Sequence, residues 1–293
     1  MNRLLALLAP VALAASLSGC GGASAAPEPD TASPPKRIVS MNPCVDTVLL
    51  DIADPGQIAA VSHYSHDPRA SSAPLAQALR YPAVSDAAED VLALSPDLVI
   101  AGRHVAPQTI AALQRMGIPL MQLGVPDTVA QSEQQISDIA ERIGRVEQGA
   151  ALNRRIAAAL AAAAPPAGSK PISALIWQSS GLVPGPGTLA DELLTRTGFR
   201  NLSADMGMQQ WDRLPLEGLL LHPPRVLMAG AASMGAGDGE ANRMISHPAL
   251  QMARKHIHIA DYPAPLLHCG GPVIMRSVAR MAAIRREVER TRP

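Results

Sequence analysis

A pattern that begins with a glutamate and ends with a glycine occurs twice in the chain. The first copy runs from Glu89 to Gly102 and reads EDVLALSPDLVIAG, and the second runs from Glu217 to Gly230 and reads EGLLLHPPRVLMAG. The two copies align without a gap, and the glutamate, an internal proline and the final glycine coincide. Chance similarity between two ordinary helix–strand units is the alternative, but the agreement at these three positions argues for a true repeat.

Each copy predicts a short helix followed by a buried strand. A glutamate suits the positive N-terminal end of a helix, and proline ends the helix because the residue before it avoids the helical region. The apolar runs 97–101 and 225–229 have the length and composition of buried parallel strands. Glycine then allows the backbone to turn sharply. Two such units, one in each half of the chain, predict two similar α/β lobes.

The N-terminus has the form of an export signal. Residues 1–20 contain Arg3, an apolar run and then the sequence LSGC, which ends at Cys20. The apolar run is too short to span a membrane. LSGC resembles a bacterial lipobox, so we expect a lipoprotein signal peptide and a periplasmic protein anchored to the membrane through a lipid on Cys20. An ordinary cleaved signal with an incidental cysteine is the alternative. Residues 21–36, rich in Gly, Ala, Ser and Pro, predict a flexible tether.

The rest of the chain divides around one long helix. Residues 37–145 are expected to form an N-terminal lobe, and residues 170–293 a C-terminal lobe. Between them, residues 146–164 form an alanine-rich helix that spans up to ~28 Å. We therefore predict an α/β fold with two Rossmann-like lobes, each with a mainly parallel sheet, joined by this one long rigid helix.

Composition and motifs exclude several functions. The formal net charge is +0 and the sequence pI is about 7.1, so nothing indicates electrostatic capture of nucleic acid or of an anionic membrane surface. The chain has no HExxH, CxxC, GxSxG or phosphate-loop pattern. No catalytic residue is therefore identified, and we expect a protein that is not an enzyme.

Polar residues at the ends of the predicted strands are the candidates for ligand binding. Open α/β sheets bind ligands beyond the carboxyl ends of their strands. That rule selects three segments of the N-terminal lobe. Their candidate residues are Asn42, Pro43, Cys44, His63, Tyr64, Arg103 and His104. In the C-terminal lobe, the loop before the terminal helix 273–290 adds His268 and Cys269.

These features together resemble the substrate-binding proteins of ABC importers for vitamin B12 and ferric siderophores. The resemblance covers residues 37 to 285 and rests on RIVSMNP, VSHYSHDP, the two glutamate repeats and the long helix between them. The resemblance implies the helical-backbone, class III arrangement, in which the ligand lies in a shallow cleft between the lobes. It also implies delivery of that ligand to an ABC permease dimer with its ATPase.

The resemblance also assigns roles to individual residues. It implies one surface glutamate in each lobe that pairs with permease arginines, and the matching positions are Glu89 and Glu217. Tyr64 and Trp211 match aromatic contacts of the cobalamin-binding relatives, and Trp177 lies close to another such position, so both tryptophans are expected to face the cleft. One candidate, Arg103, departs from the family pattern. Arg103 replaces an expected aromatic residue, and its guanidinium would suit an anionic chelate or a propionate.

Two cysteines other than Cys20 lie in loops expected on the ligand side, one in each lobe. The first interpretation is a disulfide between Cys44 and Cys269, which the periplasm permits and which would tie the lobes together. The second is that Cys44, Cys269 and His268, together with His63 or His104, contact a metal centre, because thiolate and imidazole suit zinc, copper, haem iron or cobalt. The third is that both are free cysteines that fill apolar space.

The sequence therefore predicts a lipid-anchored binding protein without a cofactor of its own. We expect it to capture a metal chelate, a ferric siderophore or cobalamin, and to deliver it to the permease. A receptor for haem or for a metal ion is the alternative. An enzyme on the same scaffold and a surface adhesin are the more distant alternatives.

Overall fold

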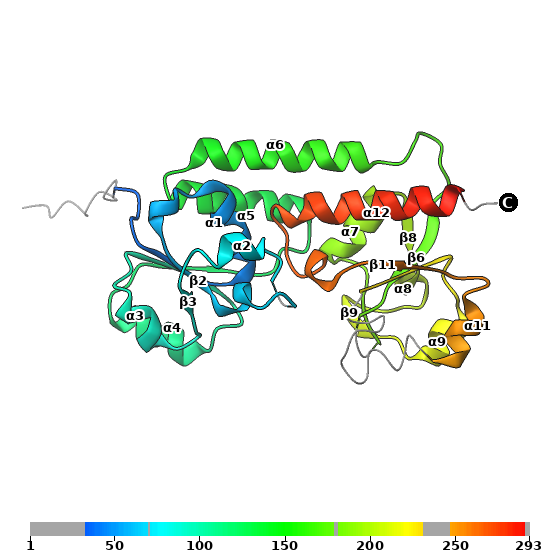
Figure 1. The fold of residues 1–293 in the computed structure, drawn as a ribbon, viewed down its shortest axis with the longest axis horizontal. Helices are drawn as coiled ribbons and strands as arrows, with labels where there is room; N and C mark the ends of the chain where they lie inside the picture. Colours follow the sequence, from blue (N-terminus) through cyan, green and yellow to red (C-terminus); the bar gives the residue numbers. More distant parts are fainter. Residues whose placement is uncertain (1–32, 70, 179–180, 231–246, 291–293) are drawn as a thin grey trace, which may run out of the picture. The chain divides into compact units, whose positions relative to one another are not determined.

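The computed structural model describes residues 33–69, 71–178, 181–230 and 247–290. The predicted signal peptide, Cys20 and most of the predicted tether lie outside these residues, so they stay predictions. Nowhere in the described segments does a helix combine the length and the apolarity that crossing a membrane requires. Figure 1 shows the elements in chain order.

The N-terminal lobe is built on one parallel sheet. Its strands lie in the order β3-β2-β1-β4-β5, and every neighbouring pair is parallel. They are β1 (Ile38–Met41), β2 (Ile58–Ser62), β3 (Ala83–Val84), β4 (Leu98–Gly102) and β5 (Leu120–Leu123). The central strands β1 and β4 are buried at every residue, as expected for strands covered by helices on both faces.

The C-terminal lobe has its own parallel sheet in the order β11-β10-β6-β8. Its strands are β6 (Ile172–Ile176), β8 (Phe199–Asn201), β10 (Val226–Ala229) and β11 (His258–Asp261). A separate antiparallel pair joins β7 (Leu182–Pro184) to β9 (Trp211–Arg213). The predicted fold class, two α/β lobes with mainly parallel sheets, is confirmed.

The sequence repeat corresponds to one helix–strand unit in each lobe. In the N-terminal lobe α3 (Ala88–Ala93) leads into β4, and in the C-terminal lobe α9 (Leu216–Leu221) leads into β10. Both strands occupy interior positions of their sheets. Glu89 and Glu217 are each the second residue of their helix, where a carboxylate suits the helix end.

The remaining helices cover the sheets. In the N-terminal lobe they are α1 (Pro43–Ile52), η1 (Pro55–Gln57), η2 (His63–His66), α2 (Leu75–Ala78), α4 (Pro107–Arg115) and α5 (Val129–Arg142). In the C-terminal lobe they are α7 (Leu189–Arg196), α8 (Leu202–Asp205), α11 (Pro248–Ala253), η5 (Ala264–Leu266) and α12 (Val273–Arg290). Threonine side chains cap α5 and α7, where Thr128 accepts from Gln131 N–H and Thr188 from Asp191 N–H.

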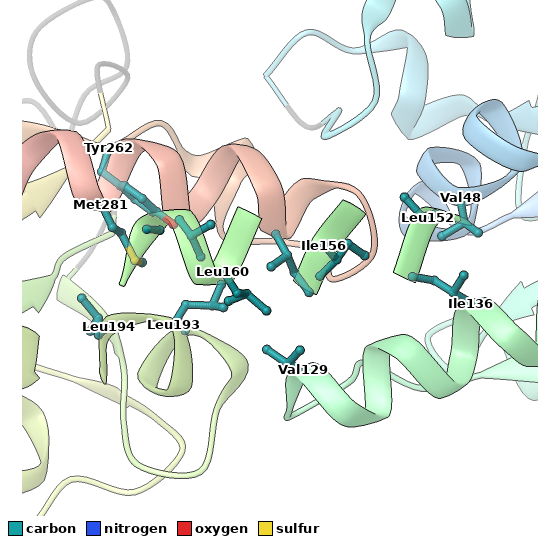
Figure 2. Packing of buried hydrophobic residues seen from close by; sticks show 14 of the residues in the cluster. Val48, Val129, Ile136, Leu152, Ile156, Leu160, Leu193, Leu194, Tyr262 and Met281 are labelled. Carbon is teal, nitrogen blue, oxygen red and sulfur yellow. The ribbon is translucent and has the colours of Figure 1, made fainter. Parts of the chain in front are cut away.

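The long helix α6 (Val146–Ala163) packs along α5 and α12, as Figure 1 shows. Its apolar face belongs to one continuous core that reaches into both lobes. Figure 2 shows Leu152 of α6 near Val48 and Ile136, and Leu160 near Leu193. The connecting helix is therefore held by packing on both sides, which stiffens the link between the lobes.

Hydrogen bonds outside the helix also join the lobes, and three of them illustrate where they lie. The Val129 N–H donates to the Glu192 carboxylate at 2.7 Å, and the Gly271 N–H donates to Ser132 Oγ at 2.7 Å. The third joins two loops, since Ser72 Oγ donates to the carbonyl of residue 265 at 2.6 Å. These contacts lie on different elements, so they restrain the lobes at several points.

Candidate functional site

A cavity of about 330 Å³ opens between loops of the two lobes. Most of the predicted ligand-binding residues line it: Asn42, Pro43, Cys44, Tyr64, Arg103, His104, His268 and Cys269. Apolar side chains form much of the wall, namely Val45, Val48, Leu123, Val125, Ile136 and Ile139. A mainly apolar cavity with a few polar groups is the usual form of a small-molecule site.

The end of β4 places a histidine at the cavity. A Cβ atom on Gly102 would collide with the ring of His104 and would lie 3.0 Å from the amide nitrogen of Asn42. Glycine is therefore needed for the close approach of His104 to the strand end. Asn42 in turn caps α1, because its Oδ1 accepts from the Cys44 N–H at 2.9 Å. Backbone geometry thus fixes both side chains at the cavity.

Arg103 supplies a positive charge at the rim. Its side chain is exposed and lies beside Gly124, where an added Cβ would be 3.5 Å from Nε. Among the residues that the structure describes, none forms a hydrogen bond or an ion pair with this guanidinium. Its five N–H donors remain available for an anionic group of a ligand, in the paired geometry that guanidinium prefers.

Aromatic rings gather on the N-terminal side of the cavity. Tyr64, in η2, is 38% exposed, and its ring centroid lies 4.0 Å from that of His63 and 6.4 Å from that of His104, which it meets edge-on. His63 does not line the cavity. Its Nδ1 lies 3.2 Å from the Val84 carbonyl oxygen, so this histidine supports Tyr64 from outside the cavity.

The two cysteines form a disulfide across the cavity wall. The Cys44 and Cys269 sulfurs are 2.07 Å apart, and their Cα atoms are 5.1 Å apart. The predicted disulfide is confirmed, and metal contact by free thiolates and the role of free apolar fillers are both wrong for these residues. The neighbouring His268 is partly shielded, and burial lowers its pKa, which favours the neutral imidazole.

Both tryptophans were expected to face the cleft, but only one of them is exposed. Trp177 is 1% exposed, packs in the C-terminal core with Leu175 and Leu227, and donates its indole N–H to the Leu214 carbonyl at 3.2 Å. The prediction that Trp177 faces the cleft is wrong, because a large side chain directly after β6 gains more from burial in the core of the lobe. Trp211 is 46% exposed.

Trp211 lines a second, smaller cavity beside the first. This cavity of about 240 Å³ shares Val125, Pro126, His268, Cys269 and Gly270 with the larger one. Trp211 reaches it from β9, and the start of α7 lies opposite. A ligand that extends past the shared loop residues would meet the indole, although the indole is absent from the lining of the main cavity.

Sequence reasoning missed the wall formed by α5. Ser132, Gln135, Ile136 and Ile139 line the cavity, and Ser132 also accepts the inter-lobe hydrogen bond from Gly271. The isoleucines have the spacing of an ordinary core-facing helix, so periodicity alone does not separate core from cavity. The two polar residues on the same side were the available signal.

Glu89 and Glu217 lie on the surface, one in each lobe. Both side chains are exposed. No ion pair with either carboxylate occurs within the described parts of the chain. Two unpaired acids at equivalent positions of the repeat are compatible with a binding role, and the docking role itself stays a prediction.

Comparison with known proteins decides the family. The family model described as "Periplasmic binding protein" matches residues 38–266. The chain belongs to the periplasmic binding protein family. The resemblance drawn from the sequence is thereby confirmed, and membership implies a periplasmic location.

Individual relatives are distant. A cobalamin-binding protein from Halobacterium salinarum is 24% identical over 206 residues, which cover 69% of this chain and 55% of that protein. This periplasmic binding protein thus spans little more than half the length of the curated relatives that it matches. Among solved structures, the periplasmic heme-binding protein RhuT from Roseiflexus sp. RS-1 is similar with a TM-score of 0.71, 21% identity and coverage of 86% and 98%.

The vitamin B12 binding protein BtuF of Vibrio cholerae is similar to this chain with a TM-score of 0.67 and 19% identity. The match covers 89% of this chain and 100% of that one. At these identities the likeness of the solved structures establishes the fold of this periplasmic binding protein, and its ligand must be argued from its own residues.

Proposed function

We propose that this protein captures a metal chelate in the cavity between its lobes and delivers it to an ABC permease with its ATPase. The observation that carries the proposal is the unpaired guanidinium of Arg103 at the rim of a mainly apolar cavity. Apolar walls and an aromatic ring suit the organic part of a chelate, and the cation suits its anionic groups. The names of the relatives, cobalamin-binding and heme-binding, support the same class of ligand.

Haem is a specific alternative to cobalamin and to a ferric siderophore. Arg103 stands where the cobalamin-binding relatives are expected to have an aromatic residue, and Trp177 is unavailable as a further ring. The guanidinium favours a chelate with carboxylate groups, such as the propionates of haem, and the missing ring weakens the match to cobalamin. A receptor for a free metal ion has less support, because the described residues include no group of three or more His, Cys, Asp and Glu that could hold one.

Parallel titrations would identify the ligand. The protein would be titrated with haem, cobalamin and a ferric siderophore, and binding would be followed by ligand absorbance. We expect saturable binding of one of them, and about tenfold to hundredfold weaker binding in Arg103→Ala if the chelate is anionic, since hydrogen bonds to charged groups are among the stronger ones. Arg115→Ala is the matched control, because Arg115 is also exposed in the same lobe but does not line the cavity.

Two results would contradict the proposal. If none of the three chelates binds, the ligand class is wrong. If a chelate binds and is converted to another product without a permease, the protein acts as an enzyme. The lipid anchor is a separate part of the proposal, and mass spectrometry of the N-terminal peptide of the mature protein would show whether Cys20 is acylated.

A further inference from the structure

Asp46 is a buried acid directly behind the cavity. It lies in the first turn of α1, the helix that contributes Pro43, Cys44 and Val45 to the cavity wall, but its own side chain is fully buried. Burial raises the pKa of Asp46 to about 7, since the charged form loses its hydration. A buried ionisable group that takes no direct part in the lining requires an explanation.

The hydrogen bonds of Asp46 lead to the loop that carries Tyr64. Its Oδ2 accepts from the Ser62 N–H at 2.9 Å and from Ser65 Oγ at 2.6 Å. These two donors stand on either side of His63 and Tyr64 in the sequence. Ser40 of β1 lies near Asp46, and its hydroxyl donates to the Asn42 carbonyl at 3.1 Å. Asp46 therefore connects α1 and the sheet to the segment that presents Tyr64 to the cavity.

The cluster formed by Asp46, Ser62 and Ser65 needs different hydrogen bonds in the two ionisation states of Asp46. Ionised, the carboxylate makes charge-assisted hydrogen bonds, which are roughly twice as strong as neutral ones. Protonated, it carries a donor that needs an acceptor. Oδ1 of Asp46 and Oγ of Ser62 are both buried without a hydrogen-bond partner among the described residues. The cluster can therefore rearrange when the proton arrives.

We propose that Asp46 is a positioning residue that holds the Tyr64 loop against the cavity, and that its ionisation state sets the affinity for the bound chelate. The proposal rests on the proposed function. The ionised form holds Ser62 and Ser65, and with them Tyr64, in the arrangement described here. Protonation weakens these two hydrogen bonds while Asp46 stays buried, so affinity falls as the pH drops through neutrality. Global unfolding has the opposite pH dependence, because it hydrates the carboxylate.

Other titratable groups on α1 and on the elements packed against it could also make binding depend on pH. On η2 they are His63 and His66, on α1 itself Asp51, and on α6 Arg155, whose guanidinium pairs with Asp51 at 2.7 Å. The strands β1 and β2 and the helix α2 carry none. None of these charges affects the pKa of Asp46, which burial raises and the hydrogen bonds partly lower again. The experiment must therefore separate an effect of the two histidines from an effect of Asp46.

The test measures the dissociation constant of the chelate identified above between pH 5.5 and 8.5 in wild type and in Asp46→Asn. We expect the wild-type affinity to fall about threefold to tenfold toward acid pH, the difference between a charge-assisted and a neutral hydrogen bond. The amide of the Asp46→Asn variant keeps the shape of the side chain but cannot titrate, so the profile of that variant should be flat. Asp51→Asn, on the same helix but paired with Arg155, should keep the wild-type profile.

Several results would overturn the proposal. A flat wild-type profile, or a pH dependence that survives in Asp46→Asn, would do so, the latter because the histidines would then be the cause. Tyr64→Ala should weaken binding and flatten the profile, and an undiminished profile would show that Asp46 does not act through Tyr64. Circular dichroism would verify that each variant is folded.

A second readout does not depend on the ligand. Hydrogen exchange of the peptide that contains Ser62–His66 would be compared in the two proteins at each pH, so that the intrinsic pH dependence of exchange cancels. Protection of this peptide above neutral pH that is greater in wild type than in Asp46→Asn, relative to core peptides of the same protein, supports the positioning role even if no chelate binds. Equal protection of wild type and Asp46→Asn at every pH overturns it.

Discussion

The inter-lobe disulfide is expected to contribute strongly to the stability of this protein. Cys44 and Cys269 are separated by 225 positions, so the bond closes most of the described chain into one loop. In the chain-entropy account, a loop of that length lowers the entropy of the unfolded state enough to contribute about 5 kcal/mol. The bond spans both lobes, so the whole contribution is expected to appear in their joint unfolding.

The perturbation is the double variant Cys44→Ala/Cys269→Ala, compared with oxidised wild type by urea unfolding under non-reducing conditions. We expect the variant to lose about 3 to 5 kcal/mol of unfolding free energy, allowing for strain and residual structure that reduce the entropic gain. Reductant should bring wild type close to the variant and leave the variant itself unchanged. A loss below about 1 kcal/mol, well under the range that the loop entropy gives, would refute the reasoning. So would two free thiols at Cys44 and Cys269 in unfolded, unreduced wild type.

Three further predictions concern single side chains and the surface. Because the pKa of folded Asp46 is about 7 against an ordinary 3.8, the folded state binds the extra proton between these values, and stability should fall by about 4 kcal/mol as pH rises across that window. Chemical unfolding at several pH values should show this slope in wild type and not in Asp46→Asn. Trp177→Ala should cost about 3 to 5 kcal/mol of unfolding free energy, as for other buried aromatic residues, whereas Trp211→Ala should leave stability nearly unchanged. Glu89→Arg/Glu217→Arg should abolish uptake in a reconstituted permease assay with unaltered chelate affinity, and normal uptake would exclude the docking role.

The fold was predictable because its signals are local and repeated. The helix–proline–strand–glycine pattern at Glu89 and at Glu217 specifies one unit in each lobe, and the alanine-rich run between them forms α6 as expected. The antiparallel pair of β7 and β9 was not predicted. Its strands are short, one ends in Pro184, and their pairing depends on residues far apart in the sequence.

The site was predictable where it follows from strand ends and not where it depends on packing. Asn42, Tyr64 and Arg103 follow parallel strands, whose carboxyl ends meet at one edge of the sheet, so the rule for open sheets places them together. Trp177 also follows a strand, but its side chain turns into the core. Asp46 gave no sequence signal, because an acid in the first turn of a helix is ordinarily an exposed partner of the helix end.

The links between the lobes leave them few relative motions. The disulfide fixes one point at the cavity, and α6, packed between α5 and α12, fixes a long line behind it. Two bodies held at a point and along a separate line can twist slightly, but they cannot swing widely apart. A ligand of the cavity would therefore enter and leave past the loops at its rim. A permease that unloads this protein would then act on those loops, and the distance between the two lobes would stay nearly constant through the transport cycle.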